Sequence, residues 1–321
     1  MDISWHSEFA EQWLERARQE RLPHAVLLSG PAGVGKRAAA AWMVAHKLGI
    51  ERQPDLPQFP WVRPEHADLH WLEKLKDKKT LKDKQSIIIE QVRKLVRDLA
   101  LTSYMGHGKA AVIEPANIMT SNAANSLLKT LEEPPGDTLL VLIADRTGRL
   151  PATVFSRCQR IDIRVPGEAE GLRWLDQYHP GGQWLEALRI AGFAPLAALE
   201  AVDFLETNDA MARDFADVIG GTISPLDVAG TWTKIEPTFV LDWLSRQVQM
   251  AIQATHGGAN GAQGLAIGNS VLQRIDTRNL FCYLDRINRL RGQPGGSWNV
   301  QSTFEGLLID WATGLDKRVM E

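Results

Sequence analysis

The chain has 321 residues, of which 44% are hydrophobic and 23% are charged, a composition typical of a soluble globular protein with two or three domains. It contains no run of 18 apolar residues and no basic N-terminal stretch followed by an apolar one, so we expect neither a membrane span nor a secretory signal. A net charge of −3 excludes a general electrostatic grip on nucleic acid. The two cysteines, Cys158 and Cys282, match no metal-ligand spacing, which favours a reduced, cytoplasmic protein.

The first half of the chain alternates between strand and helix patterns. An apolar strand at 24–29 leads through a glycine-rich loop into an alanine-rich helix at 36–49, and four prolines predict a loop at 50–66. Further strands are predicted at 68–72, 109–114, 138–144 and 158–165, and further helices at 86–103 and 120–135. This alternation predicts a parallel sheet covered by helices. We interpret the lysine-rich run at 74–84 as a solvated loop rather than a DNA contact.

After Pro166 the strand patterns stop. Three short helices are predicted within 167–206, and longer amphipathic helices follow from about residue 209. The clearest of these are at 238–256 and 299–315, with a glycine-rich connector at 257–264. We expect the tryptophans of this region to anchor a hydrophobic core rather than to stack on bases; they are Trp232, Trp243, Trp298 and Trp311.

The segment GPAGVGKR has the glycine spacing of a phosphate-binding loop, formed by Gly30, Gly33 and Gly35. Between a strand and a helix, its backbone N–H groups would converge on an anion, and Lys36 would reach the outer phosphates. The alternative is a coincidental glycine turn. A magnesium-binding loop has Ser or Thr after the lysine, but this chain has Arg37, which has no lone pair to offer a metal.

The second strand of such a site has changed as well. An ATPase of this type carries Asp and then Glu at the end of that strand, whereas this chain has Glu114 followed by Pro115. Proline cannot orient an attacking water. The loss of both the metal ligand and the hydrolytic base predicts that the chain does not hydrolyse ATP. A working ATPase or nucleotide kinase remains the alternative and would require Arg37 and Pro115 to be tolerated.

A third candidate is the triplet Ser156-Arg157-Cys158, which lies between a short predicted helix and the last strand. Arg157 either pairs with a surface acid or acts as an arginine finger on a nucleotide held by a neighbouring subunit. Such a finger raises a rate by about 10³–10⁵ because it neutralises charge in the transition state. The nearby arginines either line a shared DNA chamber or form a solvated, acid-paired set; they are Arg146, Arg149, Arg157, Arg160 and Arg164.

The segment NSLLKTLEEPP at 125–135, followed by SRC at 156–158, resembles the bacterial clamp-loader group of the AAA+ superfamily. The segments at 21–36, 106–125 and 299–311 resemble the same group, so the likeness covers essentially the whole chain. Because the phosphate loop is degenerate, the chain is most similar to the family of delta-prime subunits of DNA polymerase III.

The resemblance implies an AAA+ module at 1–166, a small three-helix lid at 167–208 and a helical collar domain at 209–321. It also implies a non-hydrolysing stator within a hetero-pentamer of gamma/tau-type ATPase subunits and a clamp-opening delta-type subunit. That complex loads a sliding clamp onto primed DNA as part of a DNA-directed DNA polymerase, a nucleotidyltransferase. Arg157 would complete the site of the adjacent ATPase. The alternative within the group is a motor-type subunit with a divergent metal site, which would still bind magnesium and ATP through Lys36.

We expect no required cofactor, and at most weak binding of phosphate, sulfate or a nucleotide at the degenerate loop. Many members of the group carry a four-cysteine zinc module after the loop helix. Here that segment contains no cysteine, which excludes a tetrahedral zinc–thiolate site; its only ligand types are Glu51, Asp55, Glu65 and His66. The lid segment at 191–199 has no arginine that could sense a γ-phosphate, which agrees with a passive site.

Overall fold

The computed structural model describes residues 1–50, 54–74, 86–145, 150–255, 265–292 and 298–315. The chain divides into two compact units, Met1–Val202 and Asp203–Glu321, each of which is described by itself. The lysine-rich run from 75 to 84 and the glycine-rich connector lie outside the described residues. Arg146 and Arg149 do so too, so their predicted roles stay predictions.

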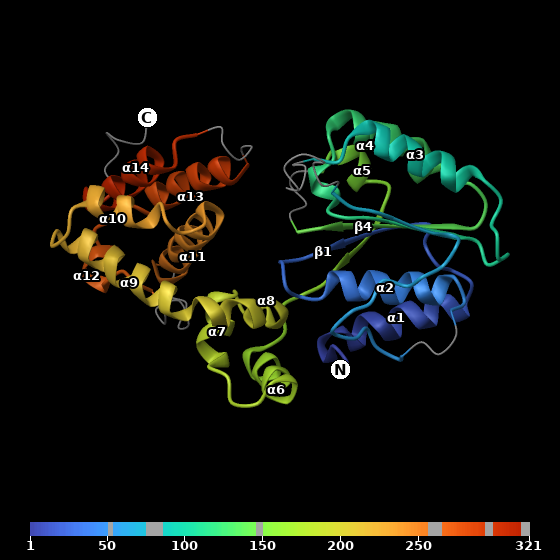
Figure 1. Ribbon diagram of the computed structural model, residues 1–321, viewed down its shortest axis with the longest axis horizontal. Coiled ribbons are helices and arrows are strands. Elements are labelled where there is room, and N and C mark those ends of the chain that lie inside the picture. The colour runs from blue at the N-terminus through green and yellow to red at the C-terminus, as the bar shows by residue number, and fades with distance from the viewer. Residues whose placement is uncertain (51–53, 75–85, 146–149, 256–264, 293–297, 316–321) are drawn as a thin grey trace. The chain divides into compact units, whose positions relative to one another are not determined.

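Five parallel strands form the centre of the first unit (Figure 1). Their order is β2-β3-β4-β1-β5, so β1 lies between β4 and β5. The glycine loop follows the carboxyl end of β1. Leu27 of β1, for example, is opposite Leu142 and Arg160 on its two neighbours. The strands are β1 (Ala25–Ser29), β2 (Leu69–Leu72), β3 (Lys109–Ile113), β4 (Thr138–Ala144) and β5 (Gln159–Asp162). The predicted parallel α/β module is confirmed.

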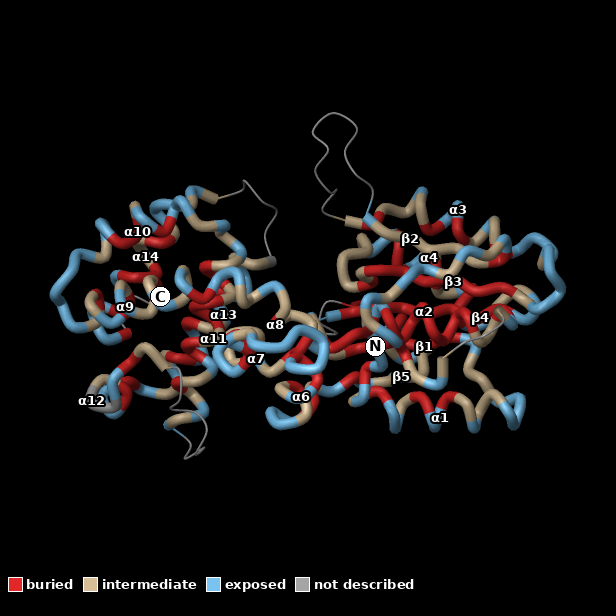
Figure 2. Tube along the Cα trace, turned by 60° about the horizontal axis from the view of Figure 1, so that its bottom comes forward, coloured by how far each residue is buried: buried red, intermediate tan, exposed pale blue. Residues whose placement is uncertain are grey.

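Helices cover both faces of this sheet, with α1 and α2 on one face and α3 and α4 on the other (Figure 1). Successive strand side chains point to opposite faces, so each strand feeds two hydrophobic cores. Val26 and Leu28 belong to the core under α1 and α2, whereas Leu27 belongs to the core under α3 and α4. Figure 2 shows β1, β3 and β4 buried along their length. The helices are α1 (Ser7–Arg18), α2 (Lys36–Lys47), α3 (Ile89–Ala100), α4 (Ser121–Glu132) and α5 (Ala152–Phe155).

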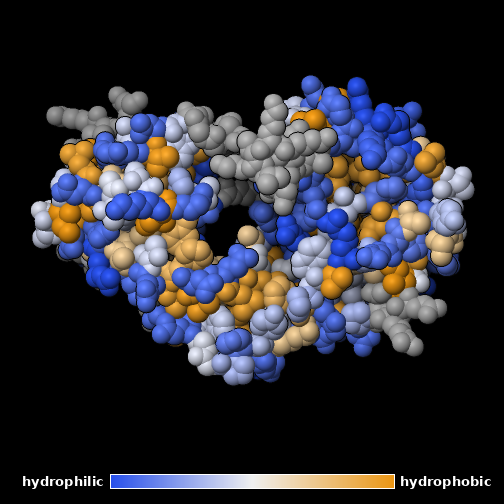
Figure 3. Space-filling model, viewed as in Figure 1, coloured by the Kyte–Doolittle hydropathy of each residue, from blue (hydrophilic) through white to orange (hydrophobic). Residues whose placement is uncertain are grey.

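The sequence explains how these helices pack. Alanines on α2 allow close contact with the sheet, and nine of its residues are buried. On α3 the buried side chains Val92, Leu95 and Leu99 recur at helical spacing, while hydrophilic residues predominate on its outer surface (Figure 3). The Thr120 side chain caps α4 by accepting a hydrogen bond from the Ala123 N–H. The helix α1 is absent from the predicted elements, although Phe9, Ala10, Trp13 and Leu14 recur on it at helical spacing and contact the core.

Three short helices complete the first unit at the positions predicted from the sequence. They are α6 (Glu168–Tyr178), α7 (Trp184–Ile190) and α8 (Pro195–Ala201), and short 3₁₀ turns lie at Ser4–His6, Ala116–Ile118 and Val202–Phe204. Each helix has a buried apolar side; Trp174 of α6, Leu188 of α7 and Ala198 of α8 lie on these sides. The next helix, in the second unit, begins at Leu205 and continues beyond 208. The division into three domains stays a prediction.

All the regular secondary structure among the described residues of the second unit is helical. Its helices are α9 (Leu205–Gly220), α10 (Pro225–Trp232), α11 (Pro237–Thr255), α12 (Asn269–Leu272), α13 (Thr277–Gly292) and α14 (Val300–Ala312). Trp232, Trp243 and Trp311 are at most 1% exposed, and Trp298 packs against the same core, which confirms the predicted anchors. Across the described part of the chain, no helix combines the length and the apolar character needed to cross a bilayer.

Candidate functional site

The glycine loop connects β1 to α2, which confirms the strand–loop–helix setting predicted for it. Gly30, Gly33 and Gly35 have φ values of 141°, 79° and 90°, a region that favours glycine. The space around the loop is equally restrictive, because a Cβ on Gly30 would lie 2.2 Å from the Ile163 carbonyl oxygen. The glycines are therefore required by this backbone itself, whether or not an anion binds.

The lysine of the loop is fully engaged within the chain. Its Nζ lies 2.8 Å from the Gly30 carbonyl oxygen and 2.7 Å from a carboxylate oxygen of Asp145, and it also donates to the Pro31 carbonyl. An ammonium group has three donors, so these contacts use all of them. The Lys36 side chain is only 5% exposed. Its charge is neutralised by Asp145, which directly follows β4.

Arg37 forms an ion pair with Glu114, the acid at the end of the second strand. Its Nε donates to the Glu114 carboxylate, whose side chain is 7% exposed, and its guanidinium lies 5.9 Å from the centre of the Trp61 ring. In a magnesium-binding loop, a hydroxyl at position 37 and the acid at the end of the second strand would share the ion. Here a guanidinium already neutralises that acid, and Pro115 follows it. The residues present do not fit a magnesium ion.

A cavity of about 350 Å³ lies beside the loop. Its charged lining consists of Lys36, Arg37, Glu114, Asp145 and Glu200, which is two cations against three carboxylates, and its apolar walls include Trp61 and Leu199. Both cations are paired with two of those carboxylates. A net negative lining disfavours a polyphosphate.

Helix α8 packs against the loop. The Leu196 N–H donates to the Gly33 carbonyl oxygen at 3.0 Å, and a Cβ on Gly33 would lie 2.4 Å from the Ala197 Cβ. Leu196, Ala197 and Leu199 line the cavity beside the loop, and residues 191–199 contain no arginine. The loop and α8 thus form one packed structure.

Arg157 lies between α5 and β5, as predicted, and it has a partner in its own chain. Its Nε donates to Glu132 of α4 at 2.5 Å, and one terminal nitrogen donates to the Thr153 carbonyl at 2.9 Å. The two charged side chains are 34% and 49% exposed. Ser156 donates to the Thr153 carbonyl at 3.2 Å, and burial raises the pKa of the Cys158 thiol to about 11. Arg157 therefore pairs with a surface acid, Glu132, as the simpler of its two interpretations predicted.

The protein-family comparison decides the family. A family model described as "DNA polymerase III, delta subunit" matches residues 5–166, about half of the chain. The chain belongs to this family. A DNA polymerase III subunit delta' from Haemophilus influenzae is 30% identical over 309 residues, which span 93% of this chain and 92% of the relative. The corresponding subunit from Pseudomonas aeruginosa is 29% identical over 321 residues, covering 94% of this chain and 95% of the relative. The predicted resemblance to delta-prime subunits is confirmed.

A tau subunit of DNA polymerase III from Bacillus subtilis is also related, but less extensively. It is 29% identical over 147 residues, which cover 46% of this chain and 25% of the relative. The delta-prime relatives thus match both units of this family member, whereas the tau relative matches less than half of its length.

Three residues that shape the site in this member of the family were missed by sequence reasoning. Asp145 directly follows an apolar strand, and that position could have marked it as a site residue. Nothing in the sequence marks Glu132 beyond its place in LEEPP. The third is His6, which lies behind the loop, where it and Trp5 donate to the Val34 carbonyl oxygen at 2.7 and 2.9 Å. Burial lowers the pKa of His6 to about 4, so its ring is neutral.

The remaining arginines differ in their surroundings. The Arg160 guanidinium lies 4.6 Å from the centre of the Phe155 ring, and Arg164 is exposed. Of the three described arginines, Arg157 is the one with an acid partner and the other two are exposed, so both interpretations of this set of arginines stay predictions. For zinc, Glu51 lies outside the described residues. Within the described ranges, no three His, Cys, Asp or Glu side chains cluster as metal ligands.

Proposed function

We propose that this chain is the non-hydrolysing stator of a DNA polymerase III clamp loader and lends Arg157 to a neighbouring ATPase subunit. Membership of the family and the nearly full-length match to delta-prime subunits support the complex in which it acts. The partners are gamma/tau-type ATPase subunits and a clamp-opening delta-type subunit, and through them primed DNA and the sliding clamp. The chain works in the cytoplasm and requires no cofactor of its own.

The ion pair of Arg37 and Glu114 is the observation that carries the non-hydrolysing part of this proposal. The pair occupies the two positions from which magnesium would be held, and the only other cation of the loop, Lys36, is bound to Asp145 and two carbonyl groups. A triphosphate with its metal would have to break both ion pairs and add charge to a lining that is already net negative.

The arginine-finger part rests on the chemistry and exposure of Arg157. A guanidinium is permanently charged and presents a planar fork of donors, which suits phosphate oxygens. The side chain is partly exposed, and its acid partner Glu132 is exposed too, so the pair is a weak one. A neighbour's γ-phosphate, with more charge than one carboxylate, would displace Glu132.

The test is DNA-stimulated ATPase activity of a complex rebuilt with the motor and clamp-opening subunits of the same bacterium. Wild type is compared with Arg157→Ala and with Arg173→Ala, an exposed arginine on α6, as a matched control. Assembly is checked by size-exclusion chromatography, and the isolated chain is assayed for turnover with magnesium and ATP. We expect Arg157→Ala alone to lower turnover, by at least about 10-fold and up to the full worth of a finger.

Two outcomes would contradict the proposal. Unchanged turnover with Arg157→Ala in an assembled complex would reduce Arg157 to a surface cation. Magnesium-dependent turnover by the isolated chain, lost in Lys36→Ala, would favour the alternative, an ATP-hydrolysing motor-type subunit with a divergent metal site.

A further inference from the structure

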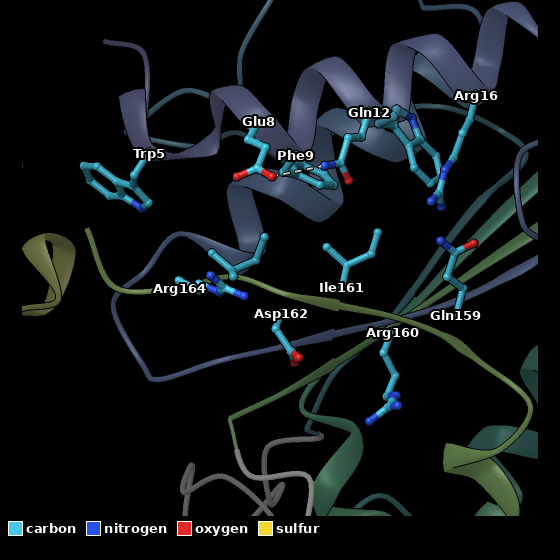
Figure 4. Close-up of a pocket in the computed structure, with 12 residues that line it drawn as sticks. Trp5, Glu8, Phe9, Gln12, Arg16, Gln159, Arg160, Ile161, Asp162 and Arg164 are labelled. Atoms are coloured by element: carbon cyan, nitrogen blue, oxygen red, sulfur yellow. Dashed lines mark hydrogen bonds between the residues drawn. The ribbon is translucent and has the colours of Figure 1, made fainter. Parts of the chain in front are cut away.

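A second hollow in the first unit is separate from the loop and from Arg157. It lies between α1 and β5 and has a volume of about 330 Å³ (Figure 4). Its apolar lining includes Trp5, Phe9 and Ile161. Its polar lining includes Glu8, Gln12, Arg16, Gln159 and Arg164. We call it the α1–β5 groove.

One wall of the groove is an open edge of the sheet. In the described structure β5 pairs with β1 alone, so its other side has no neighbouring strand. The Ile163 N–H donates to the Ser29 carbonyl of β1 at 2.8 Å. Since the backbone groups of a parallel strand alternate in direction, those of Arg160 and Asp162 point away from β1. Such an edge is a ready template for another strand.

The side chains that enter the groove carry unpaired positive charge. Arg16 points from α1 toward Gln159, while Arg160 and Asp162 point to the opposite side of β5 (Figure 4). Neither Arg16 nor Arg164 has an ion-pair or hydrogen-bond partner for its side chain among the described residues. Of the two acids in the lining, Asp162 points its carboxylate away from α1 (Figure 4), whereas Glu8 faces the groove and accepts a hydrogen bond from Gln12 at 3.3 Å. The groove thus offers two free guanidinium groups against one carboxylate.

A buried donor of the lining also lacks an acceptor. Trp13 lines the groove and is 1% exposed, and its indole Nε1–H makes no hydrogen bond. An unsatisfied buried donor costs about 1–3 kcal/mol, and buried polar groups are nearly always paired. An oxygen of a bound segment, admitted by a small movement of the lining, would satisfy it.

We propose that the α1–β5 groove binds an extended, acidic peptide segment of a partner protein, which joins the sheet as a strand beside β5. The backbone of the segment pairs with the open edge at Arg160 and Asp162. Side chains at alternate positions of the segment face α1, where their carboxylates reach Arg16 and Arg164 and their methylene groups pack on Phe9 and Ile161. The open edge favours a peptide over nucleic acid, because a nucleic-acid backbone carries phosphates for the arginines but has no groups that continue a sheet.

The test uses NMR spectroscopy of the isotope-labelled full chain. The probe is a soluble eight-residue peptide of alternating Glu and Thr, and a second version of it is N-methylated at alternate residues so that it cannot pair with a strand. We expect the first peptide to bind with a Kd below about 1 mM and to shift the resonances of 159–164 and of the Trp13 indole N–H. The N-methylated peptide should bind at least about tenfold more weakly.

Matched variants separate the groove from general charge effects. Arg164→Glu should weaken peptide binding at least about tenfold, because it places a like charge against the carboxylates. Arg18→Glu, on the same helix as Arg16 but outside the groove and 75% exposed, should leave it unchanged. The proposal is overturned if the peptide causes no shifts at 159–164, or if both peptides bind equally. It is also overturned if a DNA duplex shifts these resonances and the peptide does not.

Discussion

Arg37 at the start of α2 and Glu114 at the end of β3 form an ion pair that joins the phosphate-loop helix to the neighbouring part of the sheet. The carboxylate is almost completely buried, whereas the arginine side chain is 56% exposed. A guanidinium therefore supplies, from the chain itself, the positive charge that a magnesium ion would bring. The loop keeps its glycines because its backbone and its contact with α8 require them.

The first prediction concerns this ion pair. Arg37→Ala leaves Glu114 buried without its partner, and we expect the first unit to lose about 1–2 kcal/mol of stability, discounted for the exposure of the arginine. This loss lowers the midpoint of thermal unfolding by about 2–8 °C. The double variant Arg37→Ala/Glu114→Gln should recover part of the loss, since it removes the unpaired charge. A double variant that is as unstable as the sum of the two single variants would show that the two side chains do not interact.

The second prediction tests the packing of α8 on the loop. Gly33→Ala places a methyl group into Ala197 at a φ of 79°, and we expect it to cost about 2–4 kcal/mol. Gly136→Ala is the matched control, because its φ of 59° carries a similar strain with nothing within 4 Å. Thermal unfolding and hydrogen exchange of 195–201 measure the effect. Equal losses in the two variants would mean that the contact with Ala197 adds nothing to the backbone strain.

The third prediction is a pH dependence. The pKa of His6 is lowered from 6.5 to about 4 by burial, so the unfolded chain takes up the proton more readily than the folded chain. The contribution of the neutral ring to the free energy of unfolding is fully present above pH 6.5. It is lost as the pH falls, by about 2 kcal/mol at pH 5 and about 3 kcal/mol at pH 4.

The variant His6→Gln isolates this contribution from that of the carboxylates. The free energy of unfolding of both proteins is measured with denaturant at pH 7.5, 6, 5 and 4. As the pH falls, the wild type should lose more stability than the variant. A difference that stays constant across this range would mean that His6 is accessible to protons in the folded chain.

The fourth prediction rests on the proposed function and concerns Glu132. We expect Glu132→Gln to release Arg157 and to raise the ATPase activity of the rebuilt complex by up to about fivefold, the worth of an exposed ion pair. Glu133→Gln, at the adjacent exposed residue, is the matched control. In an Arg157→Ala background the Glu132 change should have no effect. If Arg157→Ala lowers the activity but Glu132→Gln does not raise it, the finger stands and the restraint by Glu132 is wrong.

The fifth prediction concerns the two thiols. Because burial raises the pKa of Cys158 to about 11, very little of it is thiolate at pH 8, whereas Cys282 is exposed on α13. We expect iodoacetamide to modify Cys282 at least about tenfold faster, as measured by mass spectrometry of the intact chain and its peptides. In Cys282→Ser the fast phase should disappear. Rapid modification of Cys158 in that variant would show that the SRC segment opens readily.

Local patterns predicted the elements well where burial is continuous. The apolar run at 138–144 became β4 with the same bounds, and the alanine-rich helix begins at Lys36 as expected. The helix α1 was missed, although its apolar residues Phe9, Ala10, Trp13 and Leu14 recur at helical spacing. The α1–β5 groove was not foreseen either, because it depends on the tertiary placement of that helix beside β5.

What the sequence determined by itself was the glycine loop between a strand and a helix, the replacement of its metal ligand by Arg37, and the SRC segment beside the last strand. These follow from residue types at short spacings, where the chain connectivity alone sets the geometry. Only the tertiary structure decided which charges meet: Lys36 with Asp145, Arg37 with Glu114, and Arg157 with Glu132. A parallel sheet brings together the ends of strands that are far apart in sequence, so the partner of a buried charge depends on strand order rather than on local pattern.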